Sequence, residues 1–211
     1  MKRQLFSLAL LFASALMGVQ AQNAQHILDK TSATLKASGG IKANFETTSY
    51  KGNKPTGTVE GELLMQSERF RVRSNAVSSW FDGRTQWTLI GGSDEVNIST
   101  PSEAERQAMN PYAFVDIYKK GYSANARTIT YNNATCYEVQ LKAKDANVDL
   151  QELRLVINSA NHLPLSIRMK RKQGDWTRIR VSNIRLHQKF DNKTFVFNKA
   201  EYPSVEIIDL R

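Results

Sequence analysis

Residues 41–65 read IKANFETTSYKGNKPTGTVEGELLM, and this stretch decides the fold class. Between Ile41 and Phe45 apolar residues alternate with polar ones, and the same period returns between Val59 and Met65. A period of two indicates strands with one apolar face. Because the turn residues Gly-Asn-Lys-Pro lie between the two halves, the stretch predicts two strands joined by a turn.

Similar alternation continues toward the C-terminus in short segments separated by turn residues such as Asp82-Gly83. The strand over 176–186 is predicted to be bulged, because its apolar parity slips after Val181. Residues 24–36 have apolar positions at helical spacing, and the segment from 102 to 121 contains two short helical patterns. We therefore expect one α+β domain whose antiparallel sheet has about ten or eleven strands and tends to curl.

The N-terminus has the features of a secretory signal peptide. Lys2 and Arg3 precede an apolar run from Leu5 to Val19, and Val19-Gln20-Ala21 places small residues before Gln22. A membrane anchor is the alternative, but about 15 apolar residues are too few to span a bilayer comfortably. We expect cleavage before Gln22, which leaves 27 basic against 20 acidic residues, a balance of +7.

The sequence offers little chemistry. Cys136 is the single cysteine, and three histidines lie far apart, so no metal motif is present. We find no phosphate-binding loop and no nucleophile motif, and we expect no catalytic residue, metal or cofactor. An exported protein without interleaved stacking aromatics is a poor candidate for nucleic acid.

Basic residues share strand faces in two places. Arg69, Arg71 and Arg73 alternate in one strand, and Arg168, Lys170, Lys172, Arg178 and Arg180 flank one hairpin. A solvated outer face is the favoured explanation of this pattern, and a patch for an anionic membrane or a partner is the alternative.

The apolar positions allow two interpretations. If all strands curl one way, their apolar residues share one face, which is either a core packed under the helices or a cavity for an apolar ligand. Periodicity does not separate the two. The candidate cavity-lining residues are Phe45, Val59, Leu63, Met65, Phe70, Val72, Trp80, Trp87, Leu89, Ile98, Leu155, Ile157, Ile167 and Met169.

Several segments, in their order and spacing, resemble the LolA family of periplasmic carriers of outer-membrane lipoproteins. They are Ile41–Thr47, Gly57–Met65 and Phe81–Thr88. Glu95–Ile98, Asn110-Pro111, Tyr118–Gly121 and Tyr202–Arg211 are similar to a LolA-like branch found in Bacteroidetes. The resemblance covers nearly the whole chain from residue 22 to residue 211, which it implies is one carrier domain.

The resemblance implies a strongly curved, unclosed half barrel with a helical lid over its concave face. The candidate lid residues are Leu28, Leu35, Tyr112, Val115, Ile117 and Tyr118. It also implies that a monomer takes acylated lipoproteins from an inner-membrane ABC transporter complex and surrenders them to an unknown outer-membrane acceptor. At the position of the family's lid-locking arginine this chain has Ser67.

Two other functions remain open from the sequence. One is a non-shuttling envelope lipid-binding protein with the same half barrel. The other is an enzyme acting on envelope lipids or glycans, which the absence of catalytic motifs disfavours.

Overall fold

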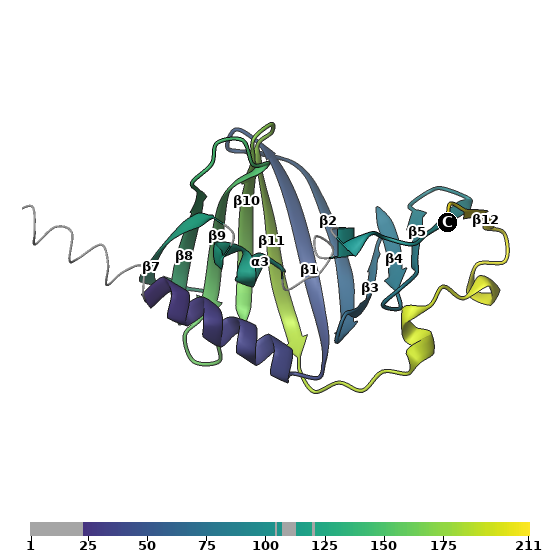
Figure 1. Ribbon diagram of the computed structural model, residues 1–211, viewed down its shortest axis with the longest axis horizontal. Helices are drawn as coiled ribbons and strands as arrows, with labels where there is room; N and C mark the ends of the chain where they lie inside the picture. Colours follow the sequence, from purple (N-terminus) through teal and green to yellow (C-terminus); the bar gives the residue numbers. More distant parts are fainter. Residues whose placement is uncertain (1–22, 104, 107–112, 120) are drawn as a thin grey trace, which may run out of the picture. The chain divides into compact units, whose positions relative to one another are not determined.

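The computed structural model describes residues 23–103, 105–106, 113–119 and 121–211 (Figure 1). The chain divides into two compact units, each assembled from two separate stretches of sequence. Unit 1 comprises residues up to Thr34 and Val115–Gly174, and unit 2 comprises Leu35–Phe114 and Asp175–Arg211. Each unit is described below by itself.

Unit 2 holds eight strands in the order β12-β6-β5-β4-β3-β2-β1-β11. All neighbours are antiparallel except β12 and β6, which are parallel. The strands are β1 (Gly40–Lys51), β2 (Lys54–Gln66), β3 (Arg69–Ser74), β4 (Val77–Phe81), β5 (Gln86–Ile90), β6 (Glu95–Ser99), β11 (Trp176–Arg185) and β12 (Glu206–Asp209). Two short 3-10 helices, η2 (Asn192–Phe195) and η3 (Lys199–Glu201), precede β12.

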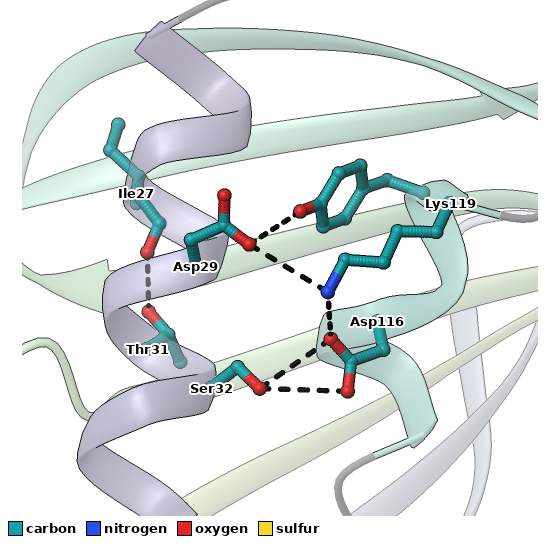
Figure 2. Close-up of polar contacts among 7 residues, drawn as sticks. Ile27, Asp29, Thr31, Ser32, Asp116 and Lys119 are labelled. Atoms are coloured by element: carbon teal, nitrogen blue, oxygen red, sulfur yellow. Dashed lines mark hydrogen bonds and ion pairs between the residues drawn. The ribbon is translucent and has the colours of Figure 1, made fainter.

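Unit 1 holds four antiparallel strands in the order β10-β9-β8-β7. They are β7 (Tyr122–Tyr131), β8 (Ala134–Ala143), β9 (Leu150–Asn158) and β10 (Pro164–Arg171). Two short helices, α3 (Ala113–Asp116) and η1 (Ile117–Lys119), precede β7. A long helix spans residues 23–37, and its residues 23–34 belong to this unit. This part of the helix lies across the strands (Figures 1 and 2).

The helix and the bulge were both predicted from the sequence, and both are present. The helix spans 23–37 where 24–36 was expected. In β11 the register against β1 shifts between Ser182 and Arg185, and Asn183 has a φ of 51°. An extra residue on one strand is what defines a bulge, and it accounts for the slip in apolar parity after Val181.

The expected half barrel is corrected in two respects. The described residues form twelve strands, mostly antiparallel, where about ten or eleven were expected, and the strands of neither unit form a closed or strongly curled sheet. Sheets of more than about ten strands curl, split or flatten. Here the strands divide between compact units of eight and four, each with buried apolar side chains of its own.

No helix among the described residues is both long enough and apolar enough to cross a bilayer. Cys136 is a free thiol, and it is buried at the start of β8 as a small core residue. Burial raises the pKa of that thiol.

Candidate functional site

An apolar stripe crosses one face of four neighbouring strands in unit 2. The pairing of β11, β1, β2 and β3 places its side chains on the same face, because directly opposed residues of a sheet point the same way. All of them are half-buried, so part of each side chain is in contact with solvent. The apolar stripe consists of Phe45, Val59, Leu63, Val72, Ile179 and Val181.

At the end next to Leu63 and Val72, the apolar stripe is bordered by buried residues. Met65 and Phe70 are opposed in the β2–β3 pairing, and both are buried. The Phe70 and Phe81 rings lie 5.5 Å apart between centroids. These buried residues therefore border the half-buried side chains of the apolar stripe.

Gly61 gives the Phe45 ring its place in the apolar stripe. A Cβ built on Gly61 would come within 2.4 Å of the Phe45 ring and 2.3 Å of the Arg73 carbonyl oxygen. Gly61 and Phe45 are directly opposed in the β1–β2 pairing. The Phe45 ring therefore lies directly against the Gly61 backbone, in the space that a side chain at position 61 would fill.

The sequence identified four of these six residues. It missed Ile179 and Val181 as site residues, although they alternate with Arg178 and Arg180 in the same period of two. Their pairing with Thr47 and Phe45 is a long-range contact, which the pattern of a single strand does not contain.

Four other predicted residues lie on the opposite face of unit 2. Trp80 is opposed to Arg71 and Trp87 to Trp80, so the tryptophans share the face of the arginines. Leu89 and Ile98 belong to that face as well. The expectation that Trp80, Trp87, Leu89 and Ile98 share a face with Phe45 is therefore wrong. The alternation of faces within each strand is visible in the sequence. The turn between β3 and β4 shifts that alternation by one residue, so that Phe81 and not Trp80 lies opposite Phe70.

The C-terminal segment covers that second face. Trp80 and Val96 form a buried cluster with Phe197 and Val205, and Trp87, Leu89 and Tyr202 pack against it. The Trp80 ring meets the Phe197 and Tyr202 rings edge to face at 5.3 and 5.7 Å. Trp80, which is 2% exposed, therefore belongs to a packed core.

The remaining predicted residues form the core of unit 1. Leu155 of β9 is opposed to Val139 on one side and Ile167 on the other, and Leu155 is completely buried. Ile157 is also buried, and Met169, opposed to Leu153, is half-buried. The helix contributes Ala24, Ile27, Leu28 and Thr31, which recur at helical spacing and are all buried. In this unit the core interpretation holds.

A cluster of polar side chains fastens η1 to the helix in unit 1 (Figure 2). The Tyr118 hydroxyl donates to Asp29 Oδ1 at 2.6 Å, and Lys119 Nζ lies 3.7 Å from the same oxygen. Lys119 Nζ also lies 2.9 Å from Asp116 Oδ1, and the Ser32 hydroxyl donates to Asp116 at 3.4 Å. We call these five residues the helix latch.

The helix latch shifts the pKa of two of its members in the same direction. Burial, followed by the hydrogen bond to Asp29, raises the pKa of the Tyr118 phenol. The hydrogen bond to Asp116 raises the pKa of the Lys119 ammonium. Both shifts favour the protonated side chains, which are the ones that donate to the carboxylates.

The predicted lid residues fall in different places. Leu28 is buried in unit 1, Leu35 is buried in unit 2, and Ile117 and Tyr118 are half-buried in η1. Tyr112 lies outside the described residues, and so does the side chain of Val115.

Ser67 is exposed in the turn between β2 and β3, with a φ of 57°. Arg69 points to the opposite face from Phe70, as its place in the strand predicted. There it donates to the Asn192 side chain and lies 5.2 Å from the centroid of the Phe195 ring. The C-terminal segment therefore engages the arginine nearest to the family's lock position.

Most of the arginines on that face of unit 2 are matched by carboxylates. Glu62 pairs with Lys42 and with Arg71, Glu46 pairs with Arg178 and Arg180, and Glu201 pairs with Arg73. The contacts with Arg180 and Lys42 lower the pKa of Glu46 and Glu62. The pKa of Glu201 is lowered by the hydrogen bond from Asn198 first and then by Arg73. The solvated outer face is thus the better interpretation of this set of basic residues.

A polar cavity of about 720 Å³ lies elsewhere in unit 2. Its lining residues are Asp82, Arg84, Thr85, Thr100, Asp209 and Arg211. None of them was predicted to bind an acyl chain, and four of the six carry a charge. Within the part of the chain that the structure describes, no group of three His, Cys, Asp or Glu side chains could hold a metal ion.

A family model for the outer membrane lipoprotein carrier protein LolA matches residues 14–173. The chain belongs to the LolA family. This is a periplasmic family of non-enzymatic carriers. The match supports the family as a whole and gives no support to a Bacteroidetes branch. No curated protein sequence matches the chain.

Several solved structures are similar to the chain. Lipoprotein LppX of Mycobacterium tuberculosis has 7% sequence identity and a TM-score of 0.52, with 81% of this chain and 98% of that chain covered. A putative outer membrane lipoprotein-sorting protein domain from Vibrio parahaemolyticus has 13% identity and a TM-score of 0.47, covering 86% and 99%. A LolA superfamily protein from Nitrosomonas europaea has 14% identity and a TM-score of 0.43, covering 82% and 97%.

Proposed function

We propose that the chain is a periplasmic carrier that holds the acyl chains of lipoproteins against the apolar stripe and moves them from the inner to the outer membrane. The observation that carries this proposal is the apolar stripe itself, six half-buried apolar side chains on one face of neighbouring strands. Membership of the LolA family supports the choice of a lipoprotein as cargo.

The remaining parts of the proposal follow the family. Residues 22–211 act as one carrier domain after the signal peptide is cleaved before Gln22. An inner-membrane ABC transporter complex supplies the acylated lipoprotein, and an outer-membrane acceptor receives it. The carrier acts as a monomer, without a cofactor.

The energetics of acyl chains explain why such a carrier is needed. Burial of each CH₂ group contributes about 0.8 kcal/mol, so a chain of about 16 carbons costs on the order of 12 kcal/mol to expose fully to water. Half-buried side chains are already partly in contact with water, so covering them with an acyl chain releases solvent from both surfaces. The fully buried core of unit 1 offers no comparable gain.

Photo-crosslinking in the native host tests the site. A photoreactive phenylalanine analogue replaces Val72, which is in the apolar stripe, or Ser78, which is half-buried on the opposite face and opposed to Arg73. Cells are grown with an alkyne-tagged fatty acid, and the crosslinked products are detected through the alkyne. We expect tagged lipoproteins to crosslink at position 72 and not at position 78.

The products also separate the alternatives. Free phospholipid without any acylated protein at position 72 would favour the non-shuttling lipid-binding protein. Equal crosslinking at both positions would contradict the apolar stripe as the site. If blocking the ABC transporter left the lipoprotein crosslinks unchanged, the proposed route from the inner membrane would be wrong.

A further inference from the structure

One end of unit 1 carries an exposed apolar side chain on a well-held loop. Residues 144–149 connect β8 to β9, and Val148 in this loop is 37% exposed. It is the one large hydrophobic side chain of the described part of unit 1 that is this exposed. The Asn147 amide donates to Asp145 at 2.8 Å, and Tyr122 donates to the Leu150 carbonyl at 2.6 Å. These hydrogen bonds hold the loop in a defined conformation, with Val148 exposed on it.

Lysines gather at the same end. Lys142 and Lys170 are both opposed to Glu152, from the two sides of β9, and so share one face of the sheet. Lys144 and Lys172 follow two residues later, just beyond β8 and β10. All four lysines are exposed. With Glu152 included, residues 142–152 and 170–172 contain five basic side chains against three acidic ones, a balance of +2.

Little in the protein neutralises this charge. Asp149 is paired with Arg171, and Asp145 caps the loop. The Lys172 ammonium has one contact, a donation to the Asn147 side chain at 3.5 Å. Within the described residues, the ammonium groups of Lys144 and Lys170 have no hydrogen-bond or ion-pair partner. This contrasts with the arginines of unit 2, most of which have carboxylate partners.

We infer that this end of unit 1 docks on an anionic membrane surface. The four lysines contact acidic lipid headgroups, and Val148 enters the boundary between headgroups and acyl chains. An apolar tip surrounded by basic residues combines the two terms that hold peripheral proteins on membranes. The partner is inferred from charge: a basic surface is complementary to a membrane with acidic headgroups. The inference goes beyond the proposed function, because it concerns where the protein docks and does not depend on which lipid it carries.

Vesicle flotation tests the inference with the protein purified after export. Vesicles of phosphatidylglycerol and phosphatidylcholine are compared with vesicles of phosphatidylcholine alone, at low and high salt. The test variant is K144E/K170E. The control variant is K189E/K193E, which makes the same change in net charge at two exposed lysines of unit 2. Circular dichroism confirms that both variants are folded.

We expect binding to the anionic vesicles only, weakened by salt, and reduced about tenfold or more in K144E/K170E, since each basic residue near such a surface contributes on the order of 1 kcal/mol. The control variant is expected to bind within about twofold of the wild type. Equal loss in both variants, equal binding to neutral vesicles, or no binding to anionic vesicles would overturn the inference.

A second measurement stays informative if the test variant does not fold. In V148C, an environment-sensitive fluorophore is attached at position 148, while Cys136 stays unlabelled because it is completely buried. A blue shift on adding anionic vesicles, and none with neutral ones, is the expected result. Unchanged emission with anionic vesicles would contradict the insertion of this loop.

Discussion

Neighbouring residues in one strand have different roles here because the side-chain period is two. Val72 belongs to the apolar stripe, while Arg71 and Arg73 on either side of it pair with Glu62 and Glu201. In unit 1, Leu155 is completely buried and Val156 beside it is only half-buried. A shift of one residue in any pairing would exchange these roles.

Gly61 offers a test at this scale. In Gly61→Ala the new Cβ would meet the Arg73 carbonyl at 2.3 Å and the Phe45 ring at 2.4 Å. Backbone on the neighbouring strand does not yield cheaply, so we expect a loss of about 1–3 kcal/mol in the free energy of unfolding. Urea unfolding followed by tryptophan fluorescence measures it.

Gly57 provides the matched control, because it lies on the same strand and a Cβ there would have no atom within 4 Å. Gly57→Ala is expected to stay within about 0.5 kcal/mol of the wild type. Equal losses in the two variants would show that the close approach at Gly61 has no energetic weight.

Single residues also mark the limit of what the sequence predicts. The period of two correctly assigned Phe45, Val59, Leu63 and Val72 to one face, since each strand carries its own alternation. It placed Trp80 on that face as well, whereas Phe81 is the residue opposed to Phe70. The choice between Trp80 and Phe81 depends on one residue in the turn after β3, and both are large and apolar.

At the scale of elements, the helix latch connects two segments that are far apart in the sequence. Asp29 and Ser32 come from the helix, and Asp116, Tyr118 and Lys119 come from α3 and η1 (Figure 2). Its ion pairs all involve the exposed Lys119 ammonium, so solvent screens them and they contribute little to stability. The helix is held chiefly by its buried apolar face.

Raised pH is expected to weaken the helix latch. The pKa values of Tyr118 and Lys119 are raised in the folded protein, so their contribution to stability is complete below their usual values near 10 and is lost as the pH rises through the folded values. Tyr118→Phe removes the donor to Asp29 and should lower the free energy of unfolding at neutral pH by about 1 kcal/mol.

The stability difference between wild type and Tyr118→Phe, measured by urea unfolding from neutral to alkaline pH, is expected to shrink above the usual tyrosine pKa. Tyr50→Phe serves as a control, since Tyr50 belongs to β1 of unit 2 and is not part of the helix latch. A difference that stays constant with pH would contradict the proposed role of the phenol proton.

Elements were predicted well where local patterns decide them. The first helical pattern predicted after residue 102 starts with a capping box, in which Glu105 accepts from the Ser102 amide and hydroxyl, both at 2.7 Å. Phe195 and Phe197 alternate as in a strand, but Phe195 ends η2 and both rings are buried in the C-terminal segment. Strand β12 is different. It forms by pairing with β6, a long-range contact that no local pattern encodes.

At the scale of the whole molecule, the sequence predicted the α+β class and the antiparallel pattern, because alternation repeated along the chain is a strong signal. It did not predict the division into two compact units or the absence of strong curvature. Both depend on how apolar residues are shared among strands that meet only in the folded chain.

Export is the prediction that belongs to this scale. We expect the protein recovered from the host periplasm to begin at Gln22, because Val19 and Ala21 place small residues before the cut. Intact-mass measurement determines the first residue, and an Ala21→Arg variant, expected to retain the leader, is the control. A wild-type mass that still includes residues 1–21 would contradict cleavage.

The parallel pairing of β12 with β6 also means that the two strands are synthesised at different times. Synthesis runs from the N-terminus, so β6 is made well before residues 206–209, which become its outer neighbour. Until they emerge, β6 presents an unpaired edge, and the face of Trp80 and Val96 lacks the cover of Phe197 and Val205. The exposure of this edge and this face, and the risk of aggregation that comes with it, therefore ends only when residues 197–209 are available to pack.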